Sequence, residues 1–455
     1  MPGLSPRYHL AYVFERFPSF TQTFCVREIL ELERQGLRPL IFSIRDTRGE
    51  TPRHFPDELF ERVVFLPPEK ELVEEVKRLK SENRLPQSVV LTLRHWKERS
   101  RTGDKQRVYE AAWIGLKLAE AGVRHAHSHF AGVGARTVWW MREFFDITYS
   151  FTGHANDLWS AASPELSLSL DDLMRDAALV ATVSDYSARD LRARFPGAAA
   201  KVKRVYNGLD LAPFRAAGAR RDAKAVWKGE RLLLSVGRLI EKKGFDDLVR
   251  ACADLKRRGV GNFRCVICGD GPMEDELRAL IAETGTGDCV DLAGPKTQPE
   301  IVALLEKAAV FALPCVTEQD GGKDNLPTVL MEAMAARVAC ASTVLAGVPE
   351  MVIEGETGLL VPERQPRAFA GILADLLADP GRTEAMGRAG EARAEELFAK
   401  EITARQLRRL QTGRGLVRFD PASVSGDPAL LGAYLRQSGV RMARWFRRRK
   451  RQPSA

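Results

Sequence analysis

The chain of 455 residues is long enough for two or three domains, and its 45% hydrophobic and 28% charged residues indicate a globular rather than a disordered protein. Its net charge of +9 is concentrated at the end, because eight Lys and Arg residues and no acid lie in residues 436–455. The rest is nearly neutral, which argues against a nucleic-acid-binding surface. No apolar run reaches the roughly 18 residues of a membrane-spanning helix, and residues 1–7 lack signal-peptide features, so we expect a cytoplasmic protein.

The seven cysteines are odd in number and scattered through apolar segments. Cys265 and Cys268 form a C-x-x-C pair, but the pair lies inside a predicted strand and has no second pair to complete a zinc site. A redox pair is expected where a strand turns into a helix. We therefore predict buried, unreactive thiols.

Short β-rich runs alternate with amphipathic helical patterns along the chain, which predicts α/β architecture with parallel sheets. In the first half, the predicted strands are 8–14, 39–44, 63–66, 125–129, 147–151 and 179–183, and the helices include 23–35, 107–121 and 135–144. In the second half, the strands are 231–237, 263–268, 289–293 and 310–314, and the helices are 245–258, 273–283, 298–307 and 328–336. Two such series predict two doubly wound, Rossmann-like domains that bind ligands where the carboxyl ends of their strands meet.

The alternation is interrupted near residues 207–229, where Pro213 and several Ala and Gly residues occur. We place the domain boundary there. The predicted organisation is an N-terminal domain (1–210), a linker (211–229), a C-terminal domain (230–395), a helix returning toward the first domain (396–411), and a linker with a basic tail (412–455).

A basic loop follows the predicted strand 231–237 and carries Arg238 and Lys243. A guanidinium fork and an ammonium at the carboxyl end of a buried strand suit a diphosphate. Taken alone, the loop is better explained as a solvated basic surface, and the diphosphate interpretation depends on the next segment.

Two carboxylates, Asp324 and Glu332, lie eight positions apart on either side of a predicted helix start. Pro327 suits a first helical turn, where its missing N–H costs nothing, and the free N–H groups of Thr328 and Val329 would form an anion site. This arrangement can bind hydroxyl groups on both sides of a diphosphate, a sugar on one side and a ribose on the other.

Read together, these segments resemble glycosyltransferase family 4 of the GT-B fold, and within it the transferases that build bacterial exopolysaccharides of the colanic-acid type. The resemblance covers roughly residues 8–410. It rests in the second half on residues 237–244 (GRLIEKKG), 268–277 (CGDGPMEDEL), 290–294 (VDLAG), 324–332 (DNLPTVLME), 347–350 (GVPE) and 356–361 (ETGLLV). In the first half it rests on residues 17–24 (FPSFTQTF), 126–130 (AHSHF), 151–157 (FTGHAND), 183–184 (VS) and 205–210 (VYNGLD).

The resemblance implies a GT-B architecture and a retaining glycosyltransferase that moves a sugar from a nucleotide-diphosphate sugar to a glycan or lipid-linked glycan. The implied catalytic residues are His154, Arg238, Lys243 and Asp324. The implied donor-binding residues are Arg238, Lys243, Gly294, Lys296, Asp324, Asn325, Leu326, Thr328, Val329 and Glu332. The implied acceptor-binding residues are Thr21, Thr23 and His129. The family usually has Glu where this chain has Asp324, and it usually has paired glycines where residues 20–23 read FTQT.

No D-x-D sequence occurs, so we expect no metal and no cofactor beyond the donor itself. His125, His127 and His129 would share one strand face and could bind a metal, but only His154 follows them in the chain. Residues 132–137 nearly match G-x-G-x-x-G outside the first βαβ unit, a weak indication of an oxidoreductase. A nucleotide-sugar epimerase and a non-catalytic glycan- or nucleotide-binding subunit remain alternatives.

The basic tail carries apolar side chains among the cations of Arg436–Arg451, a composition that suits an anionic membrane surface. We therefore expect peripheral attachment to the inner face of the cytoplasmic membrane and no nucleic-acid partner. The sequence leaves open a disordered basic end, the oligomeric state, the nucleotide base, the donor sugar and the acceptor.

Overall fold

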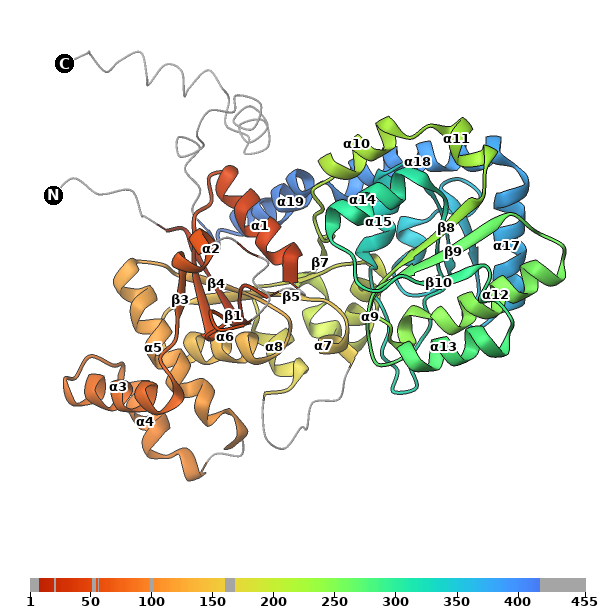
Figure 1. Cartoon of the computed structure of the whole chain (residues 1–455). Helices are drawn as coiled ribbons and strands as arrows, with labels where there is room; N and C mark the ends of the chain where they lie inside the picture. Colours follow the sequence, from red (N-terminus) through yellow and green to blue (C-terminus); the bar gives the residue numbers. More distant parts are fainter. Residues whose placement is uncertain are drawn as a thin grey trace, which may run out of the picture.

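The computed structural model describes residues 8–19, 22–50, 55, 57–98, 102–159 and 168–417 (Figure 1). Thr21 and the basic segment Arg436–Arg451 lie outside the described residues. Two parallel sheets occupy separate lobes, the first coloured red to yellow in Figure 1 and the second green to blue. This confirms the predicted α/β fold with two doubly wound domains.

The N-terminal sheet has seven parallel strands in the order β3-β2-β1-β4-β5-β6-β7. They are β1 (Leu10–Arg16), β2 (Pro39–Arg45), β3 (Val63–Phe65), β4 (His125–His129), β5 (Thr148–Gly153), β6 (Leu179–Thr182) and β7 (Val202–Arg204). The helices of this lobe are α1 (Thr23–Arg34), α2 (Asp57–Glu61), α3 (Glu69–Ser81), α4 (Gln87–Arg94), α5 (Lys105–Ala121), α6 (Val133–Phe144), α7 (Asn156–Trp159), α8 (Leu170–Asp176) and α9 (Asp185–Arg194). Strands β4 and β5 pair in register, so His129 lies opposite Thr152 at the carboxyl edge.

The C-terminal sheet has six parallel strands in the order β10-β9-β8-β11-β12-β13. They are β8 (Arg231–Val236), β9 (Phe263–Cys268), β10 (Val290–Leu292), β11 (Ala308–Leu313), β12 (Ala339–Thr343) and β13 (Gly358–Val361). The helices that follow β7 are α10 (Ala212–Arg220), α11 (Ala223–Lys228), α12 (Phe245–Arg257), α13 (Glu274–Glu283), α14 (Gln298–Lys307), α15 (Thr328–Ala335), α16 (Val348–Met351), α17 (Pro366–Ala378), α18 (Pro380–Phe398) and α19 (Lys400–Gly413). Every residue of β11 is buried, as expected for a central strand that helices cover on both faces.

Helix α19 belongs to the C-terminal end of the chain but packs on the N-terminal lobe, beside α1 (Figure 1). The Gln35 side chain donates a hydrogen bond of 2.9 Å to the carbonyl of Glu401, and Gln406 donates one of 2.8 Å to the carbonyl of Arg204. The exact domain boundaries stay predictions. All seven cysteines are buried and free, as predicted. Among the helices that the structure describes, none combines the length and apolar character needed to cross a bilayer.

Candidate active site

The basic loop after β8 is held against the end of β11 by a glycine. Gly244 has a φ of +65°, and a Cβ atom at this position would lie 1.9 Å from the carbonyl oxygen of Pro314. Only glycine fits such a conformation and such an approach. The loop therefore carries Lys243 to Asp324, with which it forms an ion pair, while the Lys242 ammonium lies 3.8 Å from the same carboxylate.

The two cations predicted to bind a diphosphate differ in their surroundings. Burial lowers the pKa of Lys243, but the charge of Asp324, the nearby Cys315 and the hydrogen bond to Asp324 together outweigh burial and hold the pKa above its ordinary value, so the ammonium stays charged. Arg238 is exposed, and no hydrogen bond or ion pair to its side chain is found within the described residues. Arg238 is therefore free to bind an anion. Lys243 would contact an anion while it remains paired with Asp324.

Helix α15 begins where the sequence places it, directly after Pro327. The first hydrogen bond of the helix runs from the N–H of Leu330 to the carbonyl of Pro327, so the N–H groups of Thr328 and Val329 precede it. Glu332 lies one turn further along the same helix. Burial raises its pKa to about 7, and Arg27 of the N-terminal lobe opposes this rise. The charge of Arg27 thus acts on Glu332 across the junction of the two lobes.

Asn325 joins the acidic loop to the N-terminal lobe. Its side chain is buried, and its amide nitrogen donates hydrogen bonds of 2.6 Å to the backbone carbonyl of His154 and 3.0 Å to the hydroxyl of Ser187. Its amide oxygen accepts a hydrogen bond of 2.6 Å from Ser184. On the other side, the N–H of Gly347 donates to the Asn325 carbonyl, where a Cβ on Gly347 would lie only 2.4 Å away.

A second link between the lobes is Glu350, which caps the start of α9. Its two carboxylate oxygens accept hydrogen bonds of 2.7 Å from the N–H of Asp185 and 2.6 Å from the N–H of Tyr186. A carboxylate at a helix N-terminus is stabilised by the free N–H groups and by the helix dipole. The C-terminal lobe therefore supplies the cap that completes a helix of the N-terminal lobe.

His154 follows β5 and belongs to a buried chain of polar side chains. Its Nε2 lies 3.0 Å from Nδ1 of His129, and Nε2 of His129 lies 3.0 Å from the carboxylate of Glu28. The hydroxyl of Tyr12 donates a hydrogen bond of 2.6 Å to the same Glu28 oxygen. Burial, with His129 nearby, lowers the pKa of His154 well below its ordinary value, so the ring is neutral.

The remaining predicted residues lie at the edges of this region. Gly294 has a φ of +68° and its carbonyl accepts a hydrogen bond of 2.9 Å from the N–H of Gly269, while Lys296 is exposed. The Leu326 side chain is buried, which leaves its backbone as the polar part able to meet a ligand. Thr23 is the first residue of α1.

Glu28, His127 and His129 bring three potential metal ligands within 4.8 Å of one another. Hydrogen bonds account for this cluster without an ion. Both ring nitrogens of His127 meet hydroxyl groups, at 2.8 Å from Ser150 and 3.1 Å from Thr152. His127 therefore has no ring nitrogen to spare for a metal, and two ligands alone make a poor site.

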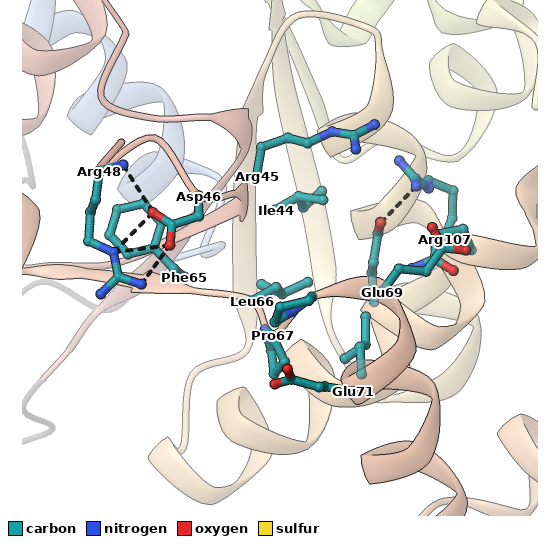
Figure 2. Close-up of a pocket in the computed structure, with 14 residues that line it drawn as sticks. Ile44, Arg45, Asp46, Arg48, Phe65, Leu66, Pro67, Glu69, Glu71 and Arg107 are labelled. Atoms are coloured by element: carbon teal, nitrogen blue, oxygen red, sulfur yellow. Dashed lines mark hydrogen bonds and ion pairs between the residues drawn. The ribbon is translucent and has the colours of Figure 1, made fainter. Parts of the chain in front are cut away.

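A separate cavity of about 600 Å³ lies in the N-terminal lobe at the ends of β2 and β3 (Figure 2). Two ion pairs lie in its lining: Arg48 with Asp46, as Figure 2 shows, and the buried Arg107 with Glu110. The sequence singles out none of the residues that line it.

Two family descriptions cover most of the chain. Residues 22–213 match Glycosyltransferase Family 4, and residues 219–393 match Glycosyl transferases group 1. A GDP-mannose-dependent alpha-(1-6)-phosphatidylinositol monomannoside mannosyltransferase of Mycolicibacterium smegmatis is 30% identical over 265 residues, which are 57% of this chain and 69% of the relative. The chain belongs to glycosyltransferase family 4.

Relatives from exopolysaccharide biosynthesis are more similar over a shorter segment. A glycosyltransferase assigned to colanic acid biosynthesis in Salmonella typhimurium is 39% identical over 176 residues, and an amylovoran biosynthesis glycosyltransferase of Erwinia amylovora is 39% identical over 175 residues. Each match spans 38% of this chain and only 43% of the relative. The resemblance to this branch of the family is confirmed.

Solved structures share the fold. An Anabaena protein in complex with UDP and glucose has a TM-score of 0.63 at 17% identity, with 89% of this chain and 100% of that chain covered. Sucrose-phosphate synthase from Thermosynechococcus elongatus has a TM-score of 0.63 at 19% identity, with 90% and 99% covered. These similarities show the two-lobed architecture.

Sequence reasoning missed Glu28, Tyr12 and Arg27, and it missed the side-chain role of Asn325. Glu28 lies on an ordinary amphipathic helix, 101 residues before its partner His129. No local pattern marks such a pair. The predicted strand 125–129 could have indicated that such partners exist. Its three histidines are all buried, and buried imidazoles need polar partners on neighbouring elements.

Proposed function

We propose that this protein is a metal-independent, retaining glycosyltransferase that transfers a sugar from a nucleotide-diphosphate sugar to a glycan or lipid-linked glycan during polysaccharide biosynthesis. One observation carries the proposal: the hydrogen bond between Asn325 and the carbonyl of His154. It unites the loop that carries Asp324, whose carboxylate pairs with Lys243, with His154 of the other lobe. Cations, a carboxylate and a neutral imidazole are thereby combined at the junction of two doubly wound domains, where such folds bind ligands.

The C-terminal lobe would bind the donor. Arg238 and Lys243 offer charge-assisted contacts to the diphosphate, and the N–H groups at the start of α15 offer an anion site with a favourable dipole. Glu332 would accept hydrogen bonds from the ribose hydroxyls. The backbone of Gly294 and Lys296 would lie near the base.

Asp324 and His154 would hold the donor sugar from opposite lobes. The Asp324 carboxylate is already oriented by Lys243, so the donor sugar would meet a fixed acceptor of hydrogen bonds. Such preorganisation reduces the cost of positioning the reacting carbon.

The chemical requirement is to stabilise the charge that develops on the β-phosphate when the sugar leaves. Arg238, Lys243 and the start of α15 supply positive charge and N–H donors at that place, which is the role of electrostatic stabilisation in catalysis. Such a site needs no divalent cation. The acceptor hydroxyl would attack from the side on which the phosphate departs, with the phosphate taking its proton, so that the anomeric configuration is retained.

The relatives indicate the chemical class of the substrates, and they differ in the nucleotide of the donor. The mycobacterial relative is named for GDP-mannose, whereas the Anabaena structure contains UDP. The exopolysaccharide relatives support an acceptor that is a growing glycan, and lipid-linked intermediates would explain why the chain carries the basic segment Arg436–Arg451. We therefore propose peripheral attachment to an anionic membrane surface.

A screen of nucleotide sugars tests this function. The purified full-length protein is incubated with uridine, guanosine, adenosine and thymidine diphosphate sugars, and released nucleoside diphosphate is measured by mass spectrometry with and without a membrane glycolipid extract. We expect one donor class to be consumed, faster with the extract. Absence of turnover of every donor under both conditions would contradict the proposal.

A further inference from the structure

His129 lies between Glu28 and His154 and contacts both through its two ring nitrogens. Each of the two distances is 3.0 Å, and the His129 side chain is only 1% exposed. The rings of Tyr12, Phe14 and Phe24 pack around it, at centroid distances of 5.7 to 6.0 Å. Water therefore has little access to His129. Which ring nitrogen carries a proton is determined by the hydrogen-bond partners in the chain of side chains.

The hydrogen bonds in this chain can be assigned a direction. The Tyr12 hydroxyl keeps its proton, because burial and the nearby Glu28 raise its pKa well above the ordinary value, and it donates to Glu28. The Glu28 carboxylate can only accept, so Nε2 of His129 must carry a proton and donate. With one proton on the His129 ring, at Nε2, its Nδ1 is unprotonated and must accept from Nε2–H of His154.

We propose that Glu28 is a positioning residue that acts through His129 to hold the neutral His154 ring in its Nε2–H form, with Nδ1 presented as a hydrogen-bond acceptor for a hydroxyl of the donor sugar. This rests on the proposed function, and it assigns to the donor sugar a free hydroxyl that donates to His154. Within the described residues Nδ1 of His154 has no hydrogen-bond partner, although the residue is only 7% exposed.

The backbone supports the same arrangement from the other side. The carbonyl of His154 is held by Asn325, and its N–H donates to the Asp157 carboxylate at 3.1 Å. The ring is packed against Phe24 and Phe130 at 4.7 and 4.5 Å between centroids. With main chain and ring both fixed, the remaining variable is which nitrogen carries the proton, and this is what the carboxylate of Glu28 would decide.

Nuclear magnetic resonance of the ring nitrogens tests the assignment without any substrate. The full-length protein is labelled with ¹⁵N-histidine, and the His154 and His129 signals are assigned from His154→Gln and His129→Gln variants at pH 7.5. We expect Nε2 protonated and Nδ1 unprotonated on both rings. In Glu28→Leu, which has no acceptor for His129, we expect both rings to change to the Nδ1–H form, whereas Glu28→Gln keeps an acceptor oxygen and the original form.

An Nδ1–H form of His154 in the wild-type protein, or an identical pattern in the wild-type protein and Glu28→Leu, would overturn the proposal. Circular dichroism and thermal unfolding check that each variant folds. The matched variant Glu33→Leu changes another glutamate of α1 that pairs with Arg62 on the surface, and its histidine signals should equal those of the wild-type protein.

Kinetics separate positioning from a purely structural role. With a donor identified by the screen above, Glu28→Leu should lower kcat about tenfold, but should cause no further loss when His154 is already replaced by alanine. Equal losses in both backgrounds would contradict the coupling. The ring-nitrogen spectra do not depend on turnover, so failure of the proposed function and failure of this proposal give different results.

Discussion

The side-chain amide of Asn325 donates a hydrogen bond of 2.6 Å to the backbone carbonyl of His154, a residue 171 positions earlier in the chain and in the other lobe. The same buried side chain also bonds to Ser184 and Ser187. The loop that carries Asp324 and the residue His154 are thereby held in one fixed relation. At Asn325 the junction of the lobes is a specific set of polar contacts, in which both the amide nitrogen and the amide oxygen have partners.

Asn325→Ala should separate this loop from the N-terminal lobe. It removes three hydrogen bonds and leaves the His154 carbonyl without that donor, so we expect a loss of about 1–3 kcal/mol in unfolding free energy and a larger fall in kcat than in donor affinity. Urea unfolding and steady-state kinetics measure the two effects. Gln406→Ala removes an amide-to-carbonyl bond elsewhere between α19 and β7, and it should leave kcat unchanged. Equal kinetics in the two variants would contradict this account of the junction.

Glu332 should make donor binding depend on pH near neutrality. Its pKa of about 7 lies above the ordinary 4.5, so the folded protein binds a proton more tightly than the unfolded chain, and stability falls as pH rises from about 4.5 to 7. Glu332→Gln should reduce that fall, as measured by unfolding at pH 5 and pH 8. Because the ionised carboxylate is the better acceptor for ribose hydroxyls, calorimetry should show the wild-type protein binding a sugar nucleotide more tightly at pH 8 than at pH 6.

Glu110 provides the matched control for this pH effect. Burial raises its pKa to about 7 as well, with Arg107 opposing the rise, but it lies at the cavity of Figure 2 rather than beside α15. Glu110→Gln should change the pH dependence of stability in the same direction and leave that of sugar-nucleotide binding as in the wild-type protein. Loss of the binding effect in Glu110→Gln, or its persistence in Glu332→Gln, would contradict the ribose role.

Chelation should leave the initial rate of transfer nearly unchanged. The chain has no D-x-D sequence, Arg238 and Lys243 supply positive charge at the proposed diphosphate site, and hydrogen bonds occupy both ring nitrogens of His127. Rates before and after treatment with EDTA provide the measurement. A collapse of the rate that Mn²⁺ or Mg²⁺ restores would contradict metal independence and would favour an ion at Glu28 and His129.

Deletion of the residues after Gly426 should release the protein from anionic vesicles at physiological salt. Eight cations lie in Arg436–Arg451, and each can contribute about 1 kcal/mol near an anionic leaflet. Co-sedimentation with vesicles that contain phosphatidylglycerol measures the difference, and neutral vesicles serve as the control. Transfer to a short water-soluble acceptor should survive the deletion. Equal co-sedimentation of the two proteins would refute the membrane role.

Much of the fold could be predicted because short β-rich runs alternate with amphipathic helical patterns along the chain. The predicted bounds of β4 and β9 equal the observed ones, His125–His129 and Phe263–Cys268. The prediction omitted β7, β12 and β13. β12 reads Ala339–Thr343, a run of small residues whose strand character comes from pairing with β11 and β13 rather than from its own side chains.

The site was only partly predictable for a similar reason. The basic loop, Asp324 and the start of α15 have local signals, namely a buried strand followed by cations and a proline before a helical pattern. The pairing of Lys243 with Asp324, the Asn325 bridge and the Glu28–His129 contact depend on segments 81, 171 and 101 residues apart. Single-sequence patterns describe elements, whereas these contacts depend on how the elements and lobes are placed.

Sugar transfer by the wild-type protein and its diphosphate-site variants tests the central claim most directly. With the donor found by screening and a glycolipid acceptor, glycosylated product is measured by mass spectrometry for the wild-type protein, Arg238→Ala, Lys243→Ala and the control Arg278→Ala, whose arginine pairs with Glu274 on α13. We predict product from the wild-type protein and the control, and a roughly ten- to hundredfold lower kcat/KM in the other two. Arg238→Ala should unfold like the wild-type protein, because its side chain is exposed. Full activity in both Arg238→Ala and Lys243→Ala would contradict the assignment of this site.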